Sequence, residues 1–165
     1  MTTEVKQIYV QSLKNTRAAE QQGLQQLERQ IERMERYPDY IALVREHIEV
    51  TKLQLDRIEA ALSDTGSDVG TLREAVTGAA GNIGAAVHAV MPDETLKNLY
   101  AGYAYQHEQI AAYQSLAVIA DAAGYGQHRE WIETTLEEER RGAEAAENLI
   151  APVTRKFLEL EMAEA

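Results

Sequence analysis

Apolar residues recur every three or four positions along most of this 165-residue chain, and that spacing predicts long amphipathic helices. No stretch alternates apolar and polar residues with the two-residue period of a half-buried strand. The segments between the three prolines are dense in Ala, Leu, Glu, Gln and Arg, which favour helix. The pattern therefore predicts a single all-α domain that covers residues 1–165.

The N-terminal part of the chain is predicted to form a helical hairpin. Its first helix is expected over residues 4–36 and stops at Pro38, because the residue before a proline disfavours helical backbone. Its second helix is expected over residues 39–62, and the short turn makes the two helices antiparallel neighbours. The core stripes of the two helices contain Leu13, Thr16, Leu24, Leu27, Ile31, Met34, Ile41, Val44, Ile48, Thr51, Leu55 and Ile58.

A second hairpin is predicted in the C-terminal part. One helix is expected over residues 93–123, where Gly124 ends it, and another over residues 127–150, which stops before Pro152. A short amphipathic tail helix is expected after Pro152, and its apolar side chains must dock on the bundle or on a second subunit. These side chains are Phe157, Leu158 and Leu160.

A small-residue segment separates the two hairpins. Residues 71–90 contain Gly78, Gly81 and Gly84, and each glycine lowers helix propensity by about 1 kcal/mol relative to Ala. We expect a helical crossover here that is less stable than the neighbouring helices. Two helical hairpins joined by a long crossover are typical of the ferritin-like antiparallel four-helix bundle.

Composition narrows the range of functions. The absence of cysteine excludes disulfides and zinc–thiolate sites, and the net charge of −11 disfavours binding to nucleic acid. No segment has the apolar character of a membrane span, and residues 1–9 do not resemble a signal peptide, so we expect a cytoplasmic protein without a membrane partner. The acidic surface and the apolar tail together favour a homodimer.

Five polar side chains interrupt the apolar stripes at one level of the predicted bundle. Glu20 and Gln54 lie at similar distances on either side of the first interhelical turn, and Gln106 and Glu139 on either side of the second. At about 1.5 Å of rise per residue, each pair is level to within about one turn. Gln109 lies one turn beyond Gln106 on the same face. We therefore expect these five side chains to meet in the core.

A buried carboxylate requires a partner, and two kinds of partner fit Glu20 and Glu139. Metal ions are one solution, and the site would then be a metal centre that also includes Gln54, Gln106 and Gln109. Hydrogen bonds from those amides and from tyrosine hydroxyls are the other solution. A dinuclear iron centre in a four-helix bundle uses more acids than these two, because hard cations need carboxylate oxygens. The centre therefore lacks negative charge for two metal ions.

Five segments carry a family resemblance that extends over nearly the whole chain. They are QIERMERYP at residues 30–38, HIEVTKLQLDRIE at 47–59, LKNLYAGYAYQHEQIAAY at 96–113, LEEER at 136–140 and PVTRKF at 152–157. Together they resemble the YciE/YciF-type ferritin-like stress-protein family. The resemblance implies a ferritin-like bundle, commonly dimeric, that is linked to stress responses and holds a dinuclear iron-type site.

The resemblance also assigns residues. Glu20 matches the acid of the family's first helix, and Glu139 matches the acid of its fourth helix, with Glu138 as neighbour in the motif. Gln54 matches a position that is Gln or His in the family. These matches imply that part of the family's metal site is present in this chain.

Three positions depart from the family pattern. Val50 stands where the family's HxxET motif has Glu, and Gln106 and Gln109 stand where its third helix reads ExxE. Glu108 does not replace them, because a residue two positions from Gln106 points about 200° away around the helix. The sequence therefore predicts a degenerate site with weak or no metal binding.

The histidines and the tyrosines of the third predicted helix are expected to serve the fold rather than a functional site. His107 and His128 are predicted to lie at the surface or against the tail, and His47 is predicted to hydrogen-bond in the core. His88 falls in the crossover. No serine has a histidine at a spacing that would suit nucleophilic catalysis, so an enzyme is not expected. Core packing is the interpretation for Tyr100, Tyr103, Tyr105 and Tyr113.

Three functions remain open at this stage. The first is a stress-associated bundle without bound metal that acts as a structural or interaction module, and it requires no cofactor. The second is a protein that binds iron, manganese or zinc through Glu20 and Glu139 and handles iron or peroxide. The third is a binder of a small ligand in a pocket near the tyrosines.

Overall fold

The structure, a computed structural model, describes residues 3–31, 34–67 and 94–164. These residues fold into four long α-helices and one short 3-10 helix, and this part of the chain contains no strand. The all-α prediction is therefore confirmed. The elements are α1 (Thr3–Ile31), α2 (Pro38–Asp64), α4 (Glu94–Ala123), η1 (Gly126–His128) and α5 (Arg129–Glu164).

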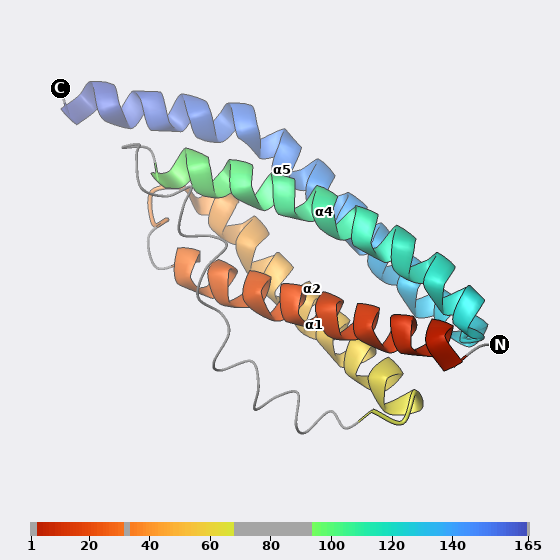
Figure 1. Ribbon diagram of the computed structural model, residues 1–165. Helices are drawn as coiled ribbons and strands as arrows, with labels where there is room; N and C mark the ends of the chain where they lie inside the picture. Colours follow the sequence, from red (N-terminus) through yellow and green to blue (C-terminus); the bar gives the residue numbers. More distant parts are fainter. Residues whose placement is uncertain (1–2, 32–33, 68–93, 165) are drawn as a thin grey trace.

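The four helices pack side by side as two antiparallel hairpins (Figure 1). Helix α1 pairs with α2 and α4 pairs with α5, while α1 also packs on α4 and α2 on α5. Helices α2 and α4 run in the same direction, as a four-helix bundle with a long crossover requires. The predicted crossover helix at residues 71–90 lies outside the described residues.

Two apolar clusters fill the interior, one toward each end of the bundle. The first surrounds Leu13 and Ile58, and the second surrounds Leu24 and Val44. Burying this apolar surface is the main force that holds amphipathic helices together. No helix of the described segments combines the length and apolar character that a membrane span needs.

The end of α1 and the turn after it differ from the prediction. Helix α1 was expected to reach residue 36, but it ends at Ile31, and residues 34–37 form a turn in which the Tyr37 amide donates to the Met34 carbonyl at 2.8 Å. Tyr37 has non-helical backbone angles because it precedes Pro38. Burial of the Met34 and Tyr37 side chains fixes the turn against the second apolar cluster.

The predicted break at Pro152 is wrong. Helix α5 continues through this proline to Glu164, so the tail is not a separate short helix. Val153 is buried, and Phe157 and Leu160 pack against the second apolar cluster. Because tertiary packing stabilises the helix on both sides of the proline, the loss of one backbone hydrogen bond is tolerated. Figure 1 shows α5 bending in its C-terminal third, which fits an internal proline.

Candidate functional site

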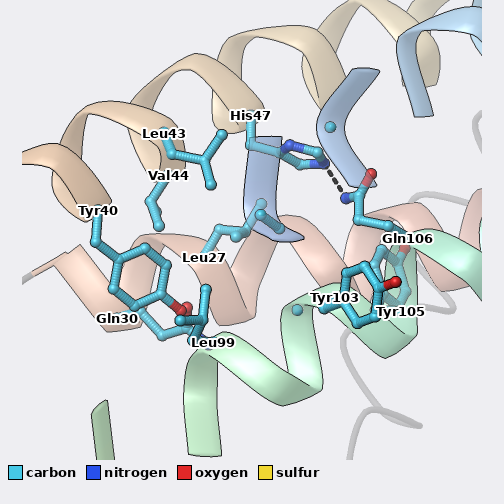
Figure 2. Close-up of a pocket in the computed structure, with 13 residues that line it drawn as sticks. Leu27, Gln30, Tyr40, Leu43, Val44, His47, Leu99, Tyr103, Tyr105 and Gln106 are labelled. Carbon is cyan, nitrogen blue, oxygen red and sulfur yellow. Dashed lines mark hydrogen bonds between the residues drawn. The ribbon is translucent and has the colours of Figure 1, made fainter. Parts of the chain in front are cut away.

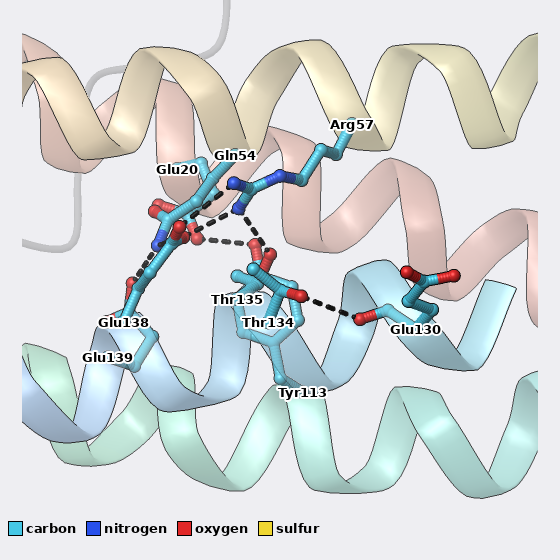
Figure 3. Close-up of polar contacts among 9 residues, drawn as sticks. All are labelled: Glu20, Gln54, Arg57, Tyr113, Glu130, Thr134, Thr135, Glu138 and Glu139. Atoms are coloured by element: carbon cyan, nitrogen blue, oxygen red, sulfur yellow. Dashed lines mark hydrogen bonds and ion pairs between the residues drawn. The ribbon is translucent and has the colours of Figure 1, made fainter.

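The structure brings the five predicted polar residues together between the two apolar clusters. They come from all four long helices, and none is more than 4% exposed. Figure 3 shows three of them, Glu20 from α1, Gln54 from α2 and Glu139 from α5, converging in the interior. We call Glu20, Gln54, Gln106, Gln109 and Glu139 the polar centre.

Two amides hold the Glu139 carboxyl group. Gln54 Nε2 donates to Glu139 Oε1 at 2.8 Å. When the Gln106 amide is oriented so that its oxygen faces His47, its nitrogen donates to Glu139 Oε2 at 2.8 Å. In this orientation Gln106 Oε1 also accepts a hydrogen bond from His47 Nε2, which satisfies all three groups. Both oxygens of Glu139 therefore have protein donors.

The contact between Gln106 and His47 depends on a glycine of α5 (Figure 2). A Cβ atom at Gly142 would lie 2.6 Å from the Gln106 side-chain amide and 2.7 Å from His47 Cε1. Both distances are shorter than van der Waals contact allows, so only glycine permits the two side chains to meet here.

Replacing this glycine tests the network. We expect Gly142→Ala to displace Gln106 and His47 and to lower the free energy of unfolding by about 1–3 kcal/mol, as overpacking of a core does. Gly102→Ala is the matched control, because a Cβ at Gly102 meets no atom within 4 Å. Because alanine favours helix over glycine, the free energy of unfolding of that control should rise by up to about 1 kcal/mol. Urea denaturation measures both, and equal stability of the two variants would contradict the contact.

Two tyrosines hold the Glu20 carboxyl group. The Tyr113 hydroxyl donates to Glu20 Oε1 at 2.7 Å, and Tyr113 is itself fully buried. The Tyr105 hydroxyl lies 3.4 Å from Glu20 Oε2 and donates to the Ala19 carbonyl at 2.9 Å. Tyr105 reaches this position across Gly23, where a Cβ would lie 2.7 Å from the Tyr105 hydroxyl oxygen.

Arg57 places a positive charge beside the polar centre (Figure 3). Its guanidinium donates to both oxygens of Glu138, at 2.6 and 2.9 Å, and to Thr135 Oγ1 at 3.1 Å. Gln54 Nε2 lies 3.3 Å from Glu138 Oε2, so the ion pair is linked to the centre. Sequence reasoning missed Arg57, although it follows Gln54 by three residues on the same helical face.

Burial controls the protonation of the two central acids. Desolvation raises the pKa of Glu20, while hydrogen bonds from Tyr113 and Tyr105 and the nearby amide of Gln109 oppose that rise. Desolvation also raises the pKa of Glu139, and the charge of Glu20 raises it further. Two acids in one desolvated site resist joint ionisation, so the pair retains a proton more readily than free carboxyl groups do.

Two amide atoms of the polar centre have no hydrogen-bond partner among the described residues. They are Gln54 Oε1, an acceptor, and Gln109 Nε2, a donor. Gln109 nevertheless faces Glu20 and favours its charged form. The sequence predicted that amides would line this site, and these two atoms are the part of the network that the protein leaves unsatisfied.

The donor set does not fit a dinuclear metal site. Within the described residues, no three side chains of His, Cys, Asp or Glu are placed to hold a metal ion together. The centre offers the carboxyl groups of Glu20 and Glu139, and the nearby Glu138 is neutralised by Arg57. Amides are weak ligands that bring no charge, whereas hard cations in bundles are balanced by several carboxylates.

The histidines lie in three different environments. His107 is exposed, as predicted, and it also contacts the Tyr103 ring edge to face. The prediction of a surface position for His128 is wrong, because it is 4% exposed. Its Nδ1 is hydrogen-bonded to the Tyr9 hydroxyl at 2.8 Å, and its Nε2 lies 3.2 Å from Asp64 Oδ2. His88 lies outside the described residues.

The four tyrosines of α4 do not share one environment. Tyr113 is fully buried, and Tyr103 and Tyr105 are half-buried. The prediction of core packing is wrong for Tyr100, which is 45% exposed. Tyr100 precedes Tyr113 by thirteen residues, and at 3.6 residues per turn this offset does not return to the same helical face.

Two antiparallel hairpins in which α2 and α4 run in the same direction are typical of the ferritin-like class of helical bundle. The family described as "Domain of unknown function (DUF892)" matches residues 4–159, and the chain belongs to this family, which lies in the ferritin-like superfamily. The crystal structure of a protein from Xanthomonas campestris pv. campestris shares the fold with a TM-score of 0.79. That likeness covers 96% of this chain and 99% of that chain at 24% sequence identity.

Proposed function

We propose that this protein is a stress-associated member of the YciE/YciF type whose dinuclear metal site has degenerated. In this proposal the polar centre holds the bundle together through hydrogen bonds, and the protein acts as a structural or interaction module. The stress association follows from the resemblance of the sequence to that family.

One observation carries the proposal. Both oxygens of Glu139 are occupied by the amides of Gln54 and Gln106, and Tyr113 donates to Glu20. A metal ion that bound these acids would have to break those hydrogen bonds in a desolvated core. It would gain only two carboxylates in return, which is too little charge for a pair of divalent or trivalent cations.

Metal analysis of the purified protein tests the proposal. The wild type is incubated with Fe²⁺, Mn²⁺ or Zn²⁺, passed through a desalting column, and assayed by elemental analysis. We expect far less than one metal ion per chain for each element. Stoichiometric metal that survives the column and is lost in Glu20→Gln and Glu139→Gln would refute the degenerate site.

A second function has one observation in its favour. Gln54 Oε1 is a fully buried acceptor without a hydrogen-bond partner among the described residues, and it adjoins the carboxyl groups. An oxygen atom in this position suits a cation. The alternative is a protein that binds iron, manganese or zinc and handles iron or peroxide, and the same metal analysis decides between the two.

The homodimer and the cytoplasmic location stay predictions. Leu158 and Met162 of α5 are 53% and 79% exposed, and exposed apolar side chains of this size favour contact with a second copy. Sedimentation equilibrium of the full chain measures the subunit number directly.

A further inference from the structure

A half-open cavity of about 50 Å³ lies beside the polar centre (Figure 2). All four long helices contribute to its wall, which ends at His47 and Gln106. Five aliphatic side chains and the rings of Tyr40, Tyr103 and Tyr105 make up most of the lining, and Gln30, His47 and Gln106 are its polar members. The function proposed above makes no use of this cavity.

The chemistry of the wall excludes charged ligands. None of the described lining residues is Asp, Glu, Lys or Arg. His47 lies at the end of this wall, against Gln106. Its Nε2 and both polar atoms of Gln106 are already engaged with each other and with Glu139. A charged group would lose its hydration here without gaining an opposite charge among the described lining residues.

The size of the cavity limits the ligand to a small molecule. The enclosed space is about one third of the roughly 150 Å³ at which an apolar protein cavity takes up benzene. A single ring can enter only in part, with its outer edge in the open mouth. Tyrosine rings from α2 and α4 provide the flat faces and edges that aromatic ligands prefer over alkyl chains.

Gly102 of α4 keeps the cavity accessible. It lines the cavity, and a Cβ atom built on it would meet no atom within 4 Å. A glycine in the middle of a helix costs stability relative to alanine. No close backbone contact requires glycine at this position, in contrast to Gly142.

From this lining, volume and glycine we propose that the cavity is a binding site for a small, uncharged aromatic molecule of one ring. The ligand enters between the tyrosines, places its apolar edge toward Leu99 and Val44, and leaves any polar substituent at the mouth. The site is separate from the carboxyl groups of the polar centre and does not depend on whether they hold metal.

Titration of the full-length protein with toluene, followed by NMR of backbone amides and tyrosine side chains, tests the site. We expect saturable shifts confined to residues around the cavity. Gly102→Leu should fill the mouth and weaken binding at least ten-fold. Leu43→Trp blocks the cavity from α2 and should have the same effect. Gly126→Ala is the matched control outside the cavity and should bind as the wild type does.

Benzoate, which has the same ring and a negative charge, serves as the second probe. We expect no saturable shifts with benzoate. The proposal is overturned if toluene causes no saturable shifts, or if both blocking variants bind toluene as well as the wild type. Equal binding of benzoate and toluene would overturn the assignment to uncharged ligands. None of these outcomes bears on metal binding by the polar centre.

Discussion

The variant V50E/Q106E/Q109E is expected to bind iron or manganese stoichiometrically, and the wild type is expected not to. The substitutions at Gln106 and Gln109 bring the acids of the centre from two to four, and the one at half-buried Val50 adds the remaining acid that the family resemblance implies. Without metal, this many buried carboxyl groups should lower the free energy of unfolding by several kcal/mol, because each lacks a compensating charge. Bound cations offset that charge, so metal should recover most of the lost stability.

Thermal denaturation with and without Mn²⁺, together with elemental analysis, measures this result. The matched control is Val50→Gln. Its side chain is polar and as long as that of glutamate, but it carries no negative charge. We expect that control to bind no metal and to show the same midpoint with and without Mn²⁺. If the triple variant folds but retains no metal, the site has been assigned to the wrong level of the bundle.

The stability of the wild type is expected to fall as the pH rises from about 6.5 to 8. Burial raises the pKa of Glu20 to about 7 and that of Glu139 to about 8, above their ordinary value of 4.5. The folded chain therefore holds protons that the unfolded chain has already released, and this stabilisation disappears as the pH passes through the folded pKa values. Over this window the loss should be about 2 kcal/mol.

His47 sets the lower edge of that window. Burial lowers the pKa of His47 from its ordinary value of 6.5 to about 4. Between these two pH values the unfolded chain binds a proton at His47 and the folded chain does not. The titration of His47 therefore lowers the free energy of unfolding as the pH falls below 6.5. In that range it opposes the gain in stability that comes from protonation of Glu20 and Glu139. Above about 6.5 the glutamates act alone among these three groups, which is why the decline should be visible between 6.5 and 8.

Urea denaturation of chelator-treated protein at a series of pH values checks this prediction. Glu139→Gln keeps the shape of the side chain and removes its titration, so we expect the decline to shrink by more than half. A decline of unchanged size in that variant would assign the titration to other groups.

The level of the polar centre was predictable because helices have a fixed rise. Glu20 and Gln54 interrupt apolar stripes at similar distances from a turn, and such residues must meet once the turn brings the helices together. The rotation of each helix about its axis is less constrained by the sequence. The sequence therefore indicated that Gln106 and Glu139 would be buried, but not that Gln106 would connect Glu139 to His47.

Long-range packing explains the errors. Pro152 is a strong local signal for a helix end, yet α5 continues through it because Phe157 and Leu160 pack against the second apolar cluster. Most residues of that cluster lie far from Pro152 in the sequence. His128 follows a turn and suggested an exposed position. It is buried because Tyr9, from the opposite end of the chain, covers it and provides a hydrogen bond. Local propensities carry no information about such partners.

The band of polar side chains between two apolar clusters also determines how the helices align along the bundle axis. Sliding one helix by a single turn would bring Glu20 or Glu139 among leucines and isoleucines and leave the opposing amides without acceptors. That arrangement costs several kcal/mol, whereas apolar clusters alone tolerate such a slip at a smaller cost. The two acids thus allow only one alignment of the helices along the bundle axis. This is a reason for the protein to retain them even when no cation is bound.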